Sequence, residues 1–96
     1  MIISVNIPDK TLYVGETPMR LEDSLRDASI EDSVLELRYA SRRKDGDSIL
    51  GTEGDKLRDI CGDNIFDTMR MDGERTSDHE YTIAIYGEDV TPRIIG

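Results

Sequence analysis

The chain has 96 residues, with 21 acidic and 12 basic side chains and a formal net charge of −9 at pH 7. This length predicts one domain, residues 1–96, with no room for both a core and a deep substrate cleft. The excess of negative charge argues against direct binding to nucleic acid or to an anionic membrane, because such a surface repels phosphate groups.

Cysteine content and hydropathy predict an intracellular, cytoplasmic protein. Cys61 is the only cysteine, so no disulfide can close within the chain, as expected in a reducing compartment. The first ten residues lack the basic region and long apolar run of a signal peptide, and no run of eighteen apolar residues follows. We therefore expect a soluble protein with no membrane partner.

The first 29 residues predict a hairpin followed by a helix. Residues 2–7 and 11–14 are rich in β-branched side chains and flank a Pro-Asp pair, which indicates two strands joined by a short loop. Thr17 is suited to the N-cap of a helix, and Pro18 to its first position. Leu21, Leu25 and Ala28 would form the buried stripe of this helix, which we expect to end near Ser29.

Residues 33–40 alternate apolar and charged side chains, which favours a strand, although a continuation of the preceding helix is the alternative. The basic run Arg42-Arg43-Lys44 and the following Asp45-Gly46-Asp47 indicate a polar turn, and Asp-Gly is typical of a hairpin.

Residues 52–71 have the most regular pattern in the chain. Thr52 resembles the start of a capping box, and apolar residues recur at the three- and four-residue spacing of one helical face. Gly62 leaves two alternatives open: one bent helix, or a short helix over residues 53–61 that ends at this glycine and is followed by a strand or a second turn.

Residues 72–80 are almost all polar and predict a loop. Residues 81–86 predict a strand that is apolar on both faces, and therefore central in its sheet or paired with a partner. The tail can add an edge strand. The predicted class is α+β: a small antiparallel sheet of four or five short strands with one or two helices packed on one face.

Catalytic and cofactor motifs are absent from the sequence, so we do not expect an enzyme. Counted from Asp45, the positions at which a calcium loop needs an oxygen ligand, a glycine and a glutamate are occupied by Ile49, Leu50 and Lys56. One cysteine and one histidine cannot form a closed zinc site, and His79 lies between two acids, as solvated residues often do. We expect no metal and no cofactor.

Acidic residues between positions 53 and 80 are the strongest candidates for a functional site. Aspartates recur at every fourth position from Asp55 to Asp67, so on a helix they would form a curved acidic ladder. Regularly spaced carboxylates can imitate phosphates and occupy the basic groove of a nucleic-acid-binding protein. An ordinary amphipathic helix with a solvated face is the alternative, but aspartates four residues apart repel one another. The predicted partner-binding residues are Glu53, Asp55, Asp59, Asp63, Asp67, Asp72, Glu74, Asp78 and Glu80.

In size, negative charge and lack of catalytic motifs, the chain resembles the small inhibitors that phages make against host defence, including DNA mimics and anti-CRISPR proteins. This resemblance implies a non-enzymatic protein that binds and inhibits a nucleic-acid-binding protein complex through its basic surface.

Two other functions remain open. The protein can be a structural or accessory module of a phage particle or larger complex that binds through a sheet edge, or through Tyr81, Ile83, Tyr86 and the Ile94-Ile95 tail. It can also self-associate as a homodimer, with the basic run at residues 42–44 against the acidic half of a second copy.

Overall fold

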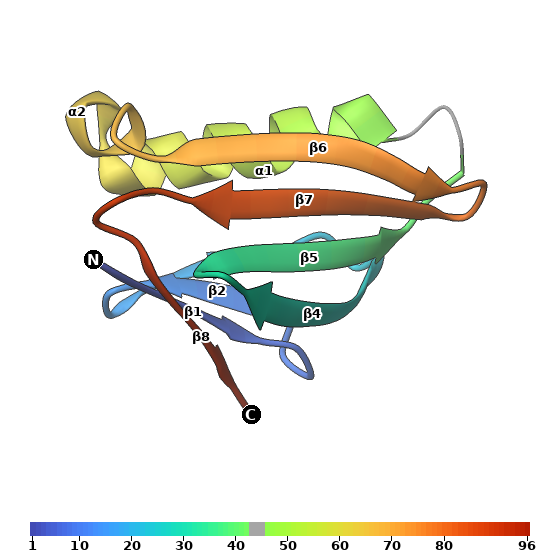
Figure 1. Ribbon diagram of the computed structural model, residues 1–96, viewed down its shortest axis with the longest axis horizontal. Coiled ribbons are helices and arrows are strands. Elements are labelled where there is room, and N and C mark those ends of the chain that lie inside the picture. The colour runs from blue at the N-terminus through green and yellow to red at the C-terminus, as the bar shows by residue number, and fades with distance from the viewer. Residues whose placement is uncertain (43–45) are drawn as a thin grey trace.

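Two four-stranded sheets and two helices make up the computed structural model of the chain, which describes residues 1–42 and 46–96 (Figure 1). The predicted α+β class is confirmed, but the strands form two sheets where one of four or five strands was expected. The strands are β1 (Ile2–Asn6), β2 (Thr11–Val14), β3 (Thr17–Arg20), β4 (Leu25–Glu31), β5 (Val34–Ala40), β6 (Arg70–Ser77), β7 (Glu80–Tyr86) and β8 (Thr91–Ile95), and the helices are α1 (Gly46–Cys61) and α2 (Asp63–Phe66).

The first sheet, sheet A, has the strand order β3-β2-β1-β8. β1 and β2 pair antiparallel, which confirms the predicted hairpin, and Lys10 adopts a positive φ of 49° in its turn. β8 pairs with β1 in parallel, with Ile3 beside Pro92 and Val5 beside Ile94. The tail therefore forms an edge strand, as the sequence allowed.

The prediction of a helix beginning at Thr17 is wrong, because this segment forms β3 and β4. β3 pairs with β2 after a turn at Gly15, whose φ is 62°. Pro18 is tolerated because β3 is an edge strand, where one side of the backbone has no partner. Leu21 and Leu25 are buried as predicted. Their four-residue spacing fits a helix, but it also fits the observed arrangement of two strands joined by a loop.

The second sheet, sheet B, has the strand order β4-β5-β7-β6 and is antiparallel throughout. The strands predicted near residues 33–40 and 81–86 are confirmed as β5 and β7, and β7 is central. The loop predicted for residues 72–80 is wrong, because most of this segment belongs to β6. β6 is polar because it is an edge strand with one face toward solvent.

α1 begins at Gly46, so Thr52 lies inside it and does not start it. The Asp-Gly pair therefore does not form the predicted hairpin at Gly46, while Arg43, Lys44 and Asp45 lie outside the described residues. The helix ends at Cys61, and Gly62 follows with a φ of 80°. Of the two alternatives, termination at Gly62 is confirmed, and the short helix α2 follows.

The core lies beneath the inner face of sheet B, part of which is covered by sheet A and part by α1. Inward residues of sheet A, such as Ile3 and Leu12, join Leu37 and Ile83 of sheet B and Leu57 of α1 in one apolar cluster. Figure 1 shows α1 lying along β6, while β1 and β2 lie behind β4 and β5 and β8 runs beside them. In the described part of the chain, neither helix combines the length and apolarity needed to cross a bilayer.

Candidate partner-binding surface

The outer face of sheet B is solvent-exposed and acidic. Successive residues of a strand point to opposite faces; because Leu35, Leu37 and Tyr39 of β5 are buried in the core, their neighbours Glu36 and Arg38 point outward. Cross-strand register extends this face over all four strands. Its carboxylates, called here the acidic face, are Asp27, Glu31, Glu36, Asp72, Glu74 and Glu80.

The register determines how far apart these carboxylates are. Glu36 and Asp72 both lie beside Ala84 on the central strand, so they are two strand spacings apart, about 9.5 Å. Asp72 and Glu74 are two residues apart on β6, which separates them by about 7 Å. Both spacings are within or close to the Debye length of about 8 Å at physiological salt, so these charges act together on an approaching partner.

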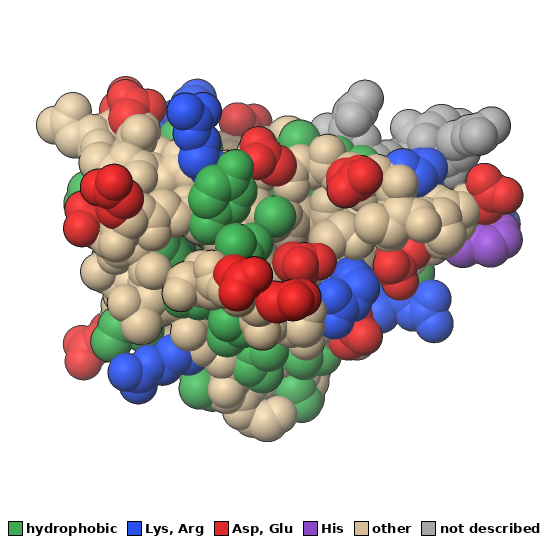
Figure 2. Space-filling model, in the orientation of Figure 1, with side chains coloured by type: hydrophobic (Ala, Val, Ile, Leu, Met, Phe, Trp, Pro, Cys, Tyr) green, Lys and Arg blue, Asp and Glu red, His purple; other side chains and the backbone are tan. Residues whose placement is uncertain are grey.

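Two arginines partly balance the acidic face. Arg38 Nε donates to Asp27 Oδ1 at 2.6 Å and Arg38 Nη1 to Ser29 Oγ at 2.9 Å, while Arg70 lies beside Tyr86. The Tyr86 hydroxyl donates to Asp72 Oδ2 at 2.6 Å, and this hydrogen bond raises the pKa of the tyrosine. Figure 2 views this side of the molecule and shows acidic side chains spread across it.

The predicted aspartate ladder is divided between two helices. Asp55 and Asp59 are exposed on α1, on the side away from buried Leu57. After the break at Gly62, Asp63 begins α2, with its Oδ1 3.7 Å from Arg58 Nε, and Asp67 follows the end of this helix. All four carboxylates are exposed, but they do not continue along one helix.

Glu53 is not a partner-binding residue, because its side chain is fully buried. Its Oε2 accepts hydrogen bonds from the Tyr39 hydroxyl at 2.7 Å and from the Glu22 backbone N–H at 3.2 Å. Its Oε1 lies 2.7 Å from Lys56 Nζ, which also donates to the carbonyl oxygen of Arg20. The prediction for this residue was wrong: Glu53 joins α1, β5 and the segment after β3 in one buried polar network.

This network predicts a loss of stability in alkali. Burial, followed by the charge of Glu53 and the hydrogen bond to it, raises the pKa of Tyr39 far above its usual value of 10.0. Above pH 10 the unfolded chain loses this proton while the folded protein keeps it, so folding stability decreases by about 1.4 kcal/mol per pH unit. Urea unfolding of wild type and Tyr39→Phe between pH 8 and 11 measures this effect. The stability difference between the two proteins should shrink above pH 10, and a constant difference would contradict the prediction.

The remaining predicted acids belong to β6, β7 and the turn between them. Asp72, Glu74 and Glu80 lie on the acidic face, where Thr76 Oγ1 donates to Glu80 Oε1 at 2.8 Å, and Asp78 is exposed in the turn. Sequence reasoning missed three residues of this face: Asp27, Glu31 and Glu36. The alternation of residues 33–40 places Glu36 on an outer face, but the sequence does not show which strands lie beside it.

Most of the residues predicted to bind a partner through apolar contacts are buried or half-buried within the protein. Tyr81 and Ile83 are buried in the core, and Tyr86 is half-buried with its hydroxyl bonded to Asp72. The tail pairs with β1, but Ile94 and Ile95 remain 42% and 41% exposed. Of this predicted surface, only the edge strand β8 is open to a partner.

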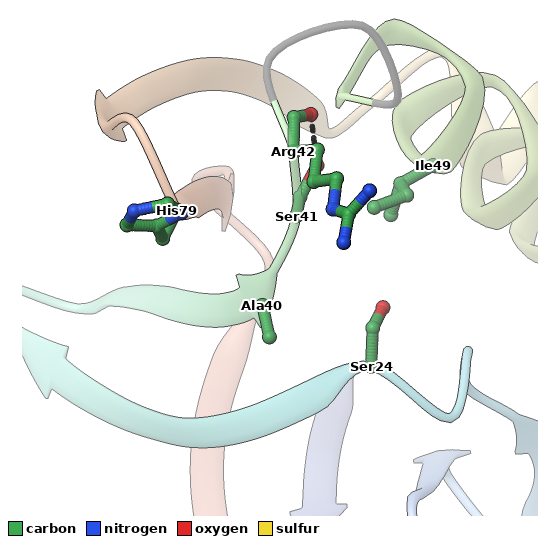
Figure 3. Close-up of a pocket in the computed structure, with 6 residues that line it drawn as sticks. All are labelled: Ser24, Ala40, Ser41, Arg42, Ile49 and His79. Atoms are coloured by element: carbon green, nitrogen blue, oxygen red, sulfur yellow. Dashed lines mark hydrogen bonds between the residues drawn. The ribbon is translucent and has the colours of Figure 1, made fainter.

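A cavity of about 490 Å³ lies beside the turn between β6 and β7. Its lining includes Ser24, Arg42, Ile49 and His79, and Figure 3 shows the Arg42 guanidinium directed toward the space between Ser24 and Ile49. His79 lies on the other side of Arg42 in this view, and this arrangement offers no nucleophile paired with a base.

Among residues 1–42 and 46–96, no three His, Cys, Asp or Glu side chains gather as a metal site requires. Burial raises the pKa of the Cys61 thiol, which makes its reactive thiolate form scarcer.

Comparison of this chain with protein-family models, with curated proteins and with solved structures found no match in any of the three.

Proposed function

We propose that the protein is a non-enzymatic binding protein that places its acidic face on the basic surface of a nucleic-acid-binding protein and inhibits it by competing with nucleic acid. This is the mode of action of the phage anti-defence and anti-CRISPR inhibitors that the sequence resembles in size and charge. The observation that supports the proposal best is the cross-strand arrangement of Glu36, Asp72 and Glu74 on one exposed sheet face.

A sheet face suits this function better than the helical ladder does. The register with two neighbouring strands fixes the spacing of the Cα atoms that carry these carboxylates, and side-chain hydrogen bonds from Tyr86 and Thr76 hold Asp72 and Glu80, which reduces the conformational entropy lost when a partner binds. The arginines of the partner would replace the counterions of the acidic face, as they do on a phosphate backbone. Asp55 and Asp59 extend the negative field without belonging to the same surface.

Charge reversal on the acidic face of sheet B is expected to weaken partner binding far more than charge reversal on α1. The variant Glu36→Lys/Glu74→Lys changes two carboxylates of the acidic face, and Asp55→Lys/Asp59→Lys makes the same charge change on α1. We expect the first variant to weaken capture of the partner at least about a hundredfold, since like charges now meet across the interface. The second variant should weaken it less than about tenfold, through the long-range field alone.

The measurement is a pull-down from nuclease-treated bacterial lysate at about 0.1 M and 0.5 M salt, between which the Debye length falls from about 10 Å to under 5 Å. A supporting result is a partner that binds duplex DNA or RNA, is lost at high salt and is displaced from the protein by added nucleic acid. Equal capture by the sheet variant and wild type, or a partner retained at both salts, would contradict the proposal.

A further inference from the structure

The outer face of sheet A carries no acidic residue, in contrast to the outer face of sheet B. Buried Ile3, Val5 and Leu12 point inward, so the alternate residues of β1 and β2, and their partners on β3 and β8, point outward. Four of these outward positions carry Ser, Asn or Thr. The larger side chains, called here the basic face, are Ile2, Tyr13, Pro18, Arg20, Arg93 and Ile95.

The basic face combines positive charge with exposed apolar surface. Arg93 is exposed between Thr91 and Ile95 on β8, at the open edge of the sheet. Ile2 and Ile95 are 42% and 41% exposed, and they flank Arg93 in the register with β1. Arg20 is exposed at the other edge, where its Nη2 lies 2.7 Å from Asp23 Oδ1. An arginine beside branched apolar side chains is typical of protein–protein contact surfaces.

The charges of the two faces decide which contacts between copies are favourable. Two acidic faces would bring an excess of carboxylates together, which is repulsive, and two basic faces would offer Arg93 no carboxylate, since Arg20 is paired with Asp23 of its own chain. The basic face of one copy against the acidic face of another pairs Arg93 with carboxylates such as Glu36 and Asp72. We propose that the protein associates with further copies of itself head to tail, with the basic face of each copy on the acidic face of the next.

The size of the faces indicates a weak interaction. Each face is four strands wide, about 19 Å, and sheet A is about 17 Å long, so the contact is smaller than the roughly 800 Å² per partner of a stable complex. The contact is heterologous and does not close on a dimer, so association continues as the concentration rises. Its dissociation constant should be on the order of 0.1 mM at low salt, and it should weaken as salt screens the charges.

Self-association uses the acidic face, as the proposed function does, and this inference partly rests on that function. Unlike partner binding, self-association also needs the basic face. A bound partner on the acidic face therefore displaces the next copy. Arg93→Glu should weaken self-association and leave partner capture intact, whereas Glu36→Lys/Glu74→Lys should weaken both.

Sedimentation velocity from about 20 µM to 1 mM, in about 0.05 M and 0.5 M salt, tests the proposal. The weight-average sedimentation coefficient of wild type should rise with concentration at low salt and stay near the monomer value at high salt. Arg93→Glu should raise the dissociation constant at least about tenfold. Arg58→Glu, which makes the same charge change at an exposed position of α1 outside both faces, is the matched control and should associate as wild type does. Circular dichroism verifies that each variant is folded.

Mixing two inactive variants is the sharper test. Arg93→Glu keeps an intact acidic face, and Glu36→Lys/Glu74→Lys keeps an intact basic face. Neither should associate alone, while the mixture should associate, because the acidic face of the first variant meets the basic face of the second. A wild-type sedimentation coefficient that does not change up to 1 mM at low salt, or a mixture that remains monomeric, would overturn the proposal.

Discussion

Replacing Glu53 by Ala is expected to destabilise the fold by about 3 kcal/mol, although this residue belongs to an acidic protein with many dispensable carboxylates. The Tyr39 hydroxyl and the Glu22 N–H would both lose their acceptor, and Lys56 would lose its ionic partner. Removing one member of a buried ion pair usually costs about 3–5 kcal/mol. The value here should lie at the lower end, because the side chain of Lys56 is 33% exposed and can turn to solvent.

Urea unfolding followed by circular dichroism measures this loss, with Asp55→Ala as the control on the same helix. Asp55 is exposed, so its replacement should change the free energy of unfolding by less than about 0.5 kcal/mol. A double-mutant cycle with Tyr39→Phe should give a coupling energy of about 1–3 kcal/mol. An effect of Glu53→Ala no larger than that of Asp55→Ala would show that the network contributes nothing.

Replacing Gly73 by Ala is expected to cost about 2–3 kcal/mol, because β6 leaves no room for a side chain at this position. A Cβ there would overlap the Tyr81 hydroxyl and would lie 2.7 Å from Tyr81 Cζ and 2.9 Å from Leu50 Cδ2. Tyr81 is buried in the core, so its ring cannot move away without disturbing its neighbours, and forced overpacking of this kind costs about 1–3 kcal/mol.

Gly51→Ala is the matched control for this experiment. No atom lies within 4 Å of the Cβ that alanine would add at Gly51, which is inside α1. Because alanine favours a helix over glycine, this variant should be up to about 1 kcal/mol more stable than wild type. Thermal and urea unfolding of both variants test the opposite signs, and a Gly73→Ala protein as stable as wild type would show that the strand can shift to admit a side chain.

Partner binding can be measured separately from folding stability. If Glu53 acts only within the network, Glu53→Gln, which stays closest to the native shape, should capture the proposed partner as wild type does. The core connects the acidic face with α1. The binding test leaves this core unchanged, because it replaces only exposed or half-exposed carboxylates. A loss of capture by Glu36→Lys/Glu74→Lys in a folded protein therefore reports on the surface.

Several elements were predictable because local alternation carries enough information. β5 alternates apolar and charged residues in step with its burial, β7 is a run of aromatic and β-branched residues that is apolar on both faces, and the β1–β2 hairpin is specified by two β-branched runs around a short turn. The end of α1 at Gly62 was one of two alternatives that the sequence left open, and the structure decides for it, since Gly62 adopts the positive φ that favours glycine. In each of these segments, the residues that decide the structure are near one another in the sequence.

The sequence by itself determined the α+β class, the β1–β2 hairpin, the strands β5 and β7 and the acidic character of the chain, and it left open whether β7 is central and whether the helix ends at Gly62. Only the tertiary structure decided that β3 and β4 replace the expected helix, that β6 joins β7, and that Glu53 is buried while Glu36 and Asp72 share an exposed face. The physical reason is that pairing and burial depend on segments far apart in the chain: a polar stretch becomes a strand when a neighbour accepts its backbone hydrogen bonds, and a carboxylate becomes structural when a buried hydroxyl and an amine meet it.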